Sequence, residues 1–164
     1  MRRKDREITD KSEIMKIIEK CDVCRLALSQ NNVPYIIPMN FAHDIIDSKP
    51  VIYFHCAKEG KKIDIIRENS AACFELDCSL KVVVVNSKHY TMEYESVIGS
   101  GNVFIVEDNK IEEKQKALSL LIKKYSPENA GELSSDDYFT DEMLNSVTIL
   151  KLMIDDFTGK QNIK

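Results

Sequence analysis

From residue 23 onward, short apolar runs separated by turn residues predict a chain built mainly of β-strands. The Asn31-Asn32 pair joins the first two runs as a hairpin turn would. Most of the other connections are equally short, which favours an antiparallel barrel over a parallel sheet. The predicted strands span 23–28, 33–42, 51–56, 71–77, 80–86, 89–106 and 147–154, the last one ending before Thr158-Gly159-Lys160.

Helical spacing of apolar residues predicts helices around this barrel. Asp10 and Glu13 have the spacing of a capping box, and isoleucines then recur every three to four residues. A second helix follows Gly60, and residues 113–125 form a third, amphipathic one. The acidic segment 126–141 is expected to be a mobile loop.

Proline and glycine mark two unusual strands. Pro34 and Pro38 cannot donate hydrogen bonds to a neighbouring strand, so the strand at 33–42 must be an edge, be bulged, or be open to something else on one side. A ligand could occupy that side. Gly99 and Gly101 suggest a bulge or a bend in the long strand at 89–106.

Composition limits the class of protein. The 164 residues are 43% apolar and 30% charged, which fits one compact domain spanning 1–164. The formal net charge of -4 gives no general attraction for nucleic acid or for an anionic membrane, so neither is an expected partner. The longest apolar run is too short to cross a bilayer and the N-terminus lacks the apolar part of a secretory signal, so a cytoplasmic location is expected.

The five cysteines fit reduced thiols, and no disulfide is expected. Cys21 and Cys24 have the spacing of a metal or redox pair, but a second pair of ligands and a thioredoxin-like setting are missing. No metal site is therefore predicted. Spacing also identifies no Ser-His-Asp set and no carboxylate dyad.

The Gly60-Lys61-Lys62 turn is a candidate anion site. Lysines at the start of a helix oppose the helix dipole, and a bound anion would resolve that conflict. Free backbone N–H groups and two ammonium groups suit a phosphate. The alternative interpretation, a solvated lysine pair on a surface helix, fits the spacing equally well.

Three histidines are candidates for chemistry. His55 shares the mixed face of its strand with Val51 and Tyr53, where it could bind a ligand, titrate near neutral pH or simply be satisfied by its neighbours. His43 and His89 lie near predicted strand ends and are weaker candidates.

The segments 34–41 (PYIIPMNF), 53–64 (YFHCAKEGKKID) and 94–101 (YESVIGSG) together resemble the pyridoxamine 5'-phosphate oxidase-related, FMN-binding split-barrel family, in particular its nitroimidazole-resistance branch. The similarity runs in order along nearly the whole chain. It implies a six-stranded antiparallel split β-barrel that forms a homodimer with FMN at the subunit interface. By this resemblance Gly60, Lys61 and Lys62 would hold the phosphate. The other implied cofactor contacts are Pro38, Met39, Asn40, His55, Cys56, Ala57, Ser96 and Val97, with Arg25 as a further candidate for the anion.

The function implied is that of an FMN-dependent oxidoreductase acting on a small molecule, in the manner of a nitroreductase, with His55 as the candidate to orient a substrate. The arginine and histidine set with which the true oxidase grips pyridoxamine phosphate is missing near the C-terminus, so that oxidation is not expected. Two alternatives stay open. One is a haem-binding protein with His43, His55 or His89 as axial ligand, and the other is a flavin-binding stress protein without turnover.

Overall fold

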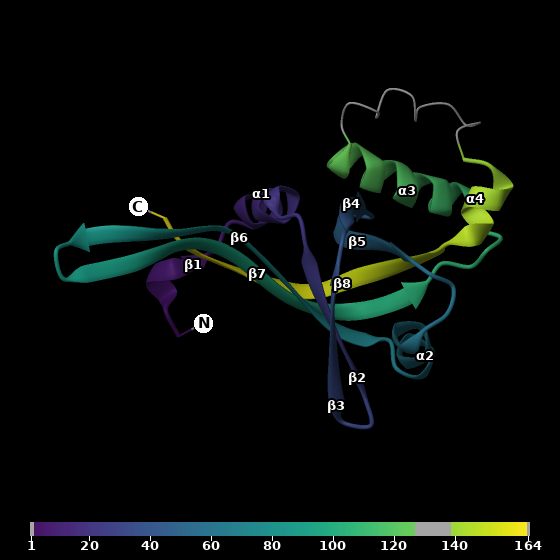
Figure 1. Cartoon of the computed structure of the whole chain (residues 1–164), viewed down its shortest axis with the longest axis horizontal. Helices are drawn as coiled ribbons and strands as arrows, with labels where there is room; N and C mark the ends of the chain where they lie inside the picture. The colour runs from purple at the N-terminus through teal and green to yellow at the C-terminus, as the bar shows by residue number, and fades with distance from the viewer. Residues whose placement is uncertain (1, 127–138, 164) are drawn as a thin grey trace.

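The structure is a computed structural model that describes residues 2–126 and 139–163 (Figure 1). One antiparallel sheet of eight strands dominates these residues. Its strands are β1 (Glu7–Ile8), β2 (Cys24–Gln30), β3 (Val33–Met39), β4 (Ala42–Ile46), β5 (Lys49–Cys56), β6 (Ala71–Asn86), β7 (His89–Ile105) and β8 (Thr148–Asn162). The helices are a 3-10 turn, η1 (Lys4–Arg6), and α1 (Lys11–Lys20), α2 (Lys61–Glu68), α3 (Ile111–Tyr125) and α4 (Asp141–Ser146).

The sheet closes on itself because its two end strands are consecutive in the chain. The strand order is β3-β2-β6-β7-β8-β5-β4, with β1 added beside β8. Only Asn40 and Phe41 separate the end of β3 from the start of β4, so the sheet must curl until its ends meet. Apolar side chains from all the long strands fill the interior, together with those of α1 and α2. The mainly β split barrel with peripheral helices is therefore confirmed.

Two tight turns set the hairpin registers. Asn31 and Asn32 have φ angles of 51° and 62°, and Asp47 and Ser48 have φ angles of 50° and 63°. Two successive left-handed residues make the turn type whose twist matches that of paired strands, and asparagine and aspartate tolerate this conformation. The sequence predicts the turn at Asn31 and Asn32.

The two prolines lie on an edge strand, which is one of the three alternatives that the sequence left open. β3 pairs only with β2, so the missing N–H groups of Pro34 and Pro38 remove no bond from a second neighbour.

Several predicted boundaries are wrong. The runs at 71–77 and 80–86 form one strand, β6, with a register shift between Cys78 and Lys81. β8 continues through the Thr-Gly-Lys sequence to Asn162, where it pairs with β7 on one side and β1 on the other. Gly159 within this part of β8 leaves room for α1 to pack closely. A β-carbon there would lie 2.6 Å from Cγ1 of Ile14. The pattern also missed β1, β4 and α4, so the sheet has two strands more than the six expected.

α1 packs against the barrel core. Asp10 accepts a hydrogen bond from the Ser12 amide at 2.8 Å, while Glu13 pairs with Lys16 and does not complete the capping box. Ile14, Ile17 and Ile18 are buried in the barrel core. No helix within the described ranges is long and apolar enough to cross a membrane. Most of the segment predicted to be a mobile loop, residues 127–138, falls outside those ranges.

β6 and β7 extend far beyond the barrel as a two-stranded ribbon, which we call the arm (residues 78–93). β2 pairs with β6 only as far as Leu76, and β8 pairs with β7 only as far as Tyr94. Figure 1 shows the arm leaving the body of the molecule, with the turn between the two strands at its tip.

We expect Gly101→Ala to lower the free energy of unfolding by about 1–3 kcal/mol, the usual cost of overpacking. A β-carbon at Gly101 would lie 2.0 Å from the carbonyl oxygen of Met153, at the register shift between β7 and β8. Ser100→Ala at the neighbouring exposed position is the control, and we expect little change there. Urea denaturation measures both, and equal stabilities for the two variants would contradict this account of the bulge.

Candidate functional site

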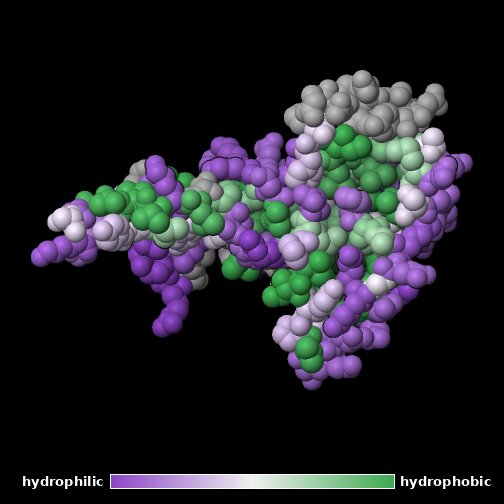
Figure 2. All heavy atoms as spheres, viewed as in Figure 1, coloured by the Kyte–Doolittle hydropathy of each residue, from purple (hydrophilic) through white to green (hydrophobic). Residues whose placement is uncertain are grey.

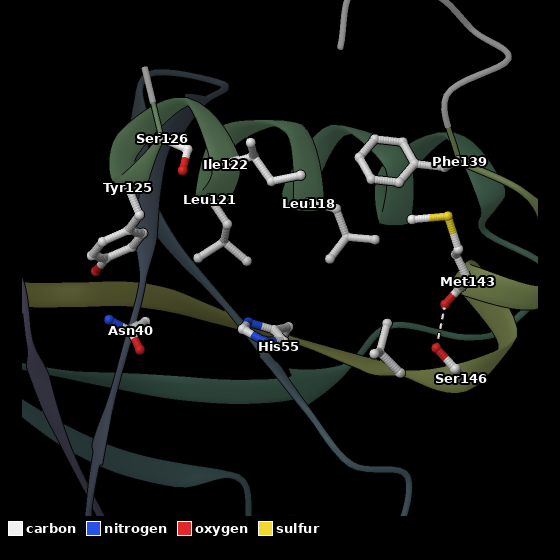
Figure 3. Close-up of a pocket in the computed structure, with 11 residues that line it drawn as sticks. Asn40, His55, Leu118, Leu121, Ile122, Tyr125, Ser126, Phe139, Met143 and Ser146 are labelled. Carbon is white, nitrogen blue, oxygen red and sulfur yellow. Dashed lines mark hydrogen bonds between the residues drawn. The ribbon is translucent and has the colours of Figure 1, made fainter. Parts of the chain in front are cut away.

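A cavity of about 520 Å³ lies outside the barrel, between the end of β5 and the helices α3 and α4 (Figure 3). Its lining is mostly apolar. Figure 3 shows Asn40 and His55 facing the side chains of α3 across it. The lining residues are Asn40, His55, Leu118, Leu121, Ile122, Tyr125, Ser126, Phe139, Met143, Ser146 and Val147.

His55 reaches the cavity because β5 is covered on both faces until it passes α3. Ile52 and Phe54 point into the barrel core, while Val51 and Tyr53 pack under α3. His55 continues the second face one step further, where it is exposed and lines the cavity. The alternation read from the sequence is therefore correct.

A polar contact fixes the first turn of α3 to the barrel. The Tyr53 hydroxyl donates to Oε1 of Glu113 at 3.0 Å, and Nζ of Lys151 donates to the same oxygen at 2.6 Å. Burial raises the pKa of the Glu113 carboxyl, but Lys151 and Tyr53 outweigh burial and the net shift is downward. Burial and the nearby carboxylate raise the pKa of Tyr53. This charged, hydrogen-bonded cluster holds α3 across β5 and β8.

The C-terminal end of α3 is fixed to the corner between β3 and β4. The Tyr125 hydroxyl donates to the carbonyl oxygen of Asp22 at 2.6 Å and accepts from the amide of Phe41 at 3.0 Å. Nζ of Lys124 lies 3.7 Å from the centre of the Phe41 ring. These contacts place Tyr125 beside Asn40 in the cavity wall.

α4 closes the far end of the cavity. Its first turn is capped by Thr140, whose hydroxyl accepts from the Met143 amide at 3.3 Å. Nζ of the fully buried Lys114 donates to the Leu144 carbonyl and to Asp108, so it ties α4 to α3. The sequence pattern did not reveal this wall, because the start of α4 falls in the acidic segment 126–141 that was predicted to be a loop. The capping threonine followed by Asp141 and Glu142 was the available signal.

The lysine turn has the geometry of an anion cradle. Gly60 has a φ of 131°, a conformation that favours glycine, and no atom lies within 4 Å of the position that a β-carbon would take. The carbonyl of Gly60 accepts the helical bonds from Ile63 and Asp64. Within the described part of the chain, the amides of Lys61 and Lys62 have no backbone partner. The start of α2 therefore presents free N–H groups and two ammonium groups together.

Two contacts join this turn to other predicted site residues. Nζ of Lys61 lies 4.8 Å from the centre of the Tyr35 ring, which places the turn beside the proline-containing edge strand β3. Burial raises the pKa of the Cys56 thiol, and the Lys62 ammonium opposes that shift, so Lys62 lies near the end of β5. Ala57 is exposed between the two.

Some of the predicted cofactor contacts have side chains that point into the barrel core, away from any cofactor bound outside it. Met39 and Val97 are buried in the barrel core, and Cys56 packs against that core. Only the main chain of these residues is available outside. Pro38 and Asn40 alternate with Met39 and are exposed.

Ser96 and Val97 are distant from the rest of the set within one chain. His55 is level with Ile149, whose carbonyl accepts from the amide of Val106. From there, nine residues of extended chain lead back to Val97, which is roughly 30 Å at 3.3 Å per residue. The structure therefore does not bring these two residues to the lysine turn of the same chain.

Arg25 lies on β2 opposite Pro38, but its guanidinium already has partners. It donates to Glu75 at 2.8 Å and also to Asp77. Two carboxylates neutralise this arginine, which leaves it little positive charge for a further anion.

The other candidate residues do not come together in a catalytic or metal-binding cluster. Burial raises the pKa of both Cys21 and Cys24, that of Cys24 to about 12, so these thiols are protonated near neutral pH. His89 contacts Asn86 at the tip of the arm, and His43 lies on β4 outside the cavity. No group of three metal-ligating side chains occurs among the described residues.

The sequence matches the family model described as pyridoxamine 5'-phosphate oxidase over residues 10–161. A candidate 5-nitroimidazole antibiotic resistance protein from Bacteroides thetaiotaomicron is 29% identical, with a TM-score of 0.78 over 94% of this chain and 86% of that one. The FAD and heme binding protein from Mycobacterium smegmatis is 18% identical, with a TM-score of 0.79 over 97% and 74%. A FAD-binding protein from Mesorhizobium loti is 18% identical, with a TM-score of 0.68 over 96% and 98%. No curated protein matches the sequence.

We expect Tyr125→Phe to destabilise the protein by about 1–3 kcal/mol, because it leaves the amide of the buried Phe41 without its acceptor. Tyr53→Phe is the matched change at the other α3 contact. It should cost about 0.5–1.5 kcal/mol, since Glu113 keeps its bond to Lys151. Thermal and urea unfolding measure the loss of stability in each variant. A larger loss of stability for Tyr53→Phe than for Tyr125→Phe would contradict this prediction.

Proposed function

The chain belongs to the pyridoxamine 5'-phosphate oxidase family, and on this premise we propose that it is a flavoprotein that holds FMN at the lysine turn and reduces a small molecule in the adjoining cavity. The observation that carries the proposal is the cradle at Gly60, Lys61 and Lys62, which opens beside the edge strand β3. FMN, when bound, supplies the electron transfer.

The phosphate group of FMN suits this turn in charge and in space. The two free amides and the dipole of α2 favour an anion, and the ammonium groups of Lys61 and Lys62 add charge-assisted bonds. A side chain at Gly60 would fill the open space above the turn. The nearest acidic residues in the chain are Glu59, before Gly60, and Asp64 in the first turn of α2, which lies 3.9 Å from Arg67.

The flat ring system would lie along the exposed main chain of β3. Pro38 and Asn40 face outward, and the prolines leave the edge of β3 incompletely paired. Asn40 belongs both to this strip and to the cavity wall, so a ring placed here has the cavity directly beside it.

The cavity sets the class of substrate. Its walls on α3 and α4 are apolar, and no charged side chain lines it among the described residues. His55 and Asn40 are the polar groups that face those walls across the cavity, and they would orient a bound molecule by hydrogen bonds. We therefore propose a small uncharged substrate, such as a nitroaromatic compound. The similarity to the Bacteroides protein supports this choice.

Two copies of the chain would complete the site. Ile98 and Phe104 on β7 and Met153 on β8 are exposed on the outer face of the central strands, which suits a subunit interface. In a homodimer, Ser96 and Val97 of one copy would approach the FMN held by the lysine turn of the other copy. Within one chain these two residues are too far from the lysine turn to do so.

We expect Lys62→Ala and Lys61→Ala each to weaken FMN binding about tenfold or more while leaving the affinity for riboflavin, which lacks the phosphate, within about twofold. Lys58→Ala is the control in the same turn, since Lys58 pairs with Asp108 and has no part in the cradle. Flavin fluorescence titration measures all three. Equal losses for FMN and riboflavin would show that the lysines do not hold the phosphate.

Haem binding is a second candidate function, favoured by one observation. Of the three histidines, only His55 lines the apolar cavity, so it is the axial ligand that this structure would offer. His43 and His89 lie elsewhere.

The visible spectrum of the purified protein distinguishes the two functions. We expect two flavin bands, with FMN released by heat and identified by chromatography. A sharp Soret band that disappears in His55→Ala but persists in His43→Ala and His89→Ala would instead establish haem binding. Release of FAD would retain the flavoprotein but contradict the choice of FMN.

A further inference from the structure

One face of the arm is apolar and exposed. Val82 lies opposite Met92, and Val84 lies opposite Tyr90, so these four side chains share a face of the ribbon. Their exposed fractions are 59%, 43%, 62% and 68%. Figure 2 shows this as a hydrophobic strip along the arm. A two-stranded ribbon gains little stability alone, and such a face is costly to leave in water.

The arm cannot reach the apolar cavity of its own chain. In Figure 1 the tip of the arm and the helices α3 and α4 lie at opposite ends of the molecule. The cavity is open to solvent, and its walls are as apolar as the face of the arm. Each copy thus carries an apolar strip and an open apolar cavity that only a second copy could bring together.

We propose that the arm of one copy packs across the open side of the partner copy's cavity and forms part of the wall of its substrate site. The inference rests on the proposed function, because the shared flavin site sets how the two copies approach. The occupant of the arm face is therefore a second copy of this chain, and the substrate would touch residues of both.

The position of the arm along β7 supports this arrangement. The arm ends at Glu93, three residues before Ser96. If Ser96 contacts the flavin of the partner copy, the arm, which continues from the same strand, must lie on the partner's surface beside that flavin. Asn40 and His55 of the partner join that surface to the cavity.

The charges at the two surfaces are complementary. Lys88 lies at the tip of the arm and is exposed. Asp141 and Glu142 are exposed in the first turn of α4, at the rim of the cavity. An arm that crosses the cavity would bring opposite charges together around an apolar contact, which is the usual pattern of a specific interface.

Cysteine cross-linking tests the contact directly. One chain carries Val84→Cys and the other carries Met143→Cys, both with Cys73→Ser to remove the exposed native thiol. The two chains have tags of different length, are expressed together, and are oxidised with copper phenanthroline. We expect a covalent heterodimer on a non-reducing gel that neither variant forms alone.

The other outcomes overturn the proposal. A covalent dimer of Val84→Cys with itself would show that two arms pair with each other. Absence of any cross-link in all combinations would show that the arm lies free. Bound flavin is measured by absorbance in the same samples. Flavin without a heterodimer refutes the arm contact alone, whereas a heterodimer without flavin refutes the proposed function and leaves the contact standing.

A second measurement uses charge and no cysteine. Val82→Asp places a carboxylate on the apolar face, and Val83→Asp makes the same change one residue along, on the opposite face. We expect Val82→Asp to raise the dimer dissociation constant at least tenfold by sedimentation, and Val83→Asp to change it less than twofold. Equal effects of the two changes would overturn the proposal.

Discussion

The barrel depends on closure at a corner of two residues, Asn40 and Phe41, which join the first and last strands of one sheet. Phe41 is completely buried in the barrel core, and Asn40 faces outward into the cavity wall. The amide of Phe41 bonds to Tyr125 at the end of α3. Closure therefore sets the position of the edge strand β3, of α3 and of the candidate site together, because all three meet at this corner.

Along β5 the side chains change from buried core positions to an exposed position in the cavity wall. From Val51 to Phe54 every side chain is buried, two of them in the barrel and two beneath α3. At His55 the strand passes beyond α3, and the same face that packed against the helix now opens into the cavity. His55 therefore points in the same direction as the buried Val51 and Tyr53, but no helix covers it. Its side chain is oriented by the strand and is still free to contact a ligand.

The distribution of lysines separates structure from binding. Lys123 and Lys124 lie in the last turn of α3, where cations favour the helix dipole. Lys61 and Lys62 lie in the first turn of α2, where cations oppose it. Packing and helix electrostatics account for the first pair and leave the second unexplained. A bound phosphate would supply the missing counter-charge, which is why this turn, and not the other lysines of the chain, indicates a ligand.

The sequence alone determined that strands dominate the chain, that Asn31 and Asn32 form a hairpin turn, and that the lysine turn is anomalous, because each follows from the alternation, conformational limits or charge of neighbouring residues. It could not predict that Leu118 and Ile122 line a cavity, since an apolar helix face has the same spacing whether it covers a core or a ligand. It also left Arg25 as a candidate for an anion, although Glu75 and Asp77, fifty residues away, bind it on the neighbouring strand. Only the tertiary structure decided these contacts and the separation of Ser96 from Lys61, because they depend on strand order and register, which bring together residues that are distant in the sequence.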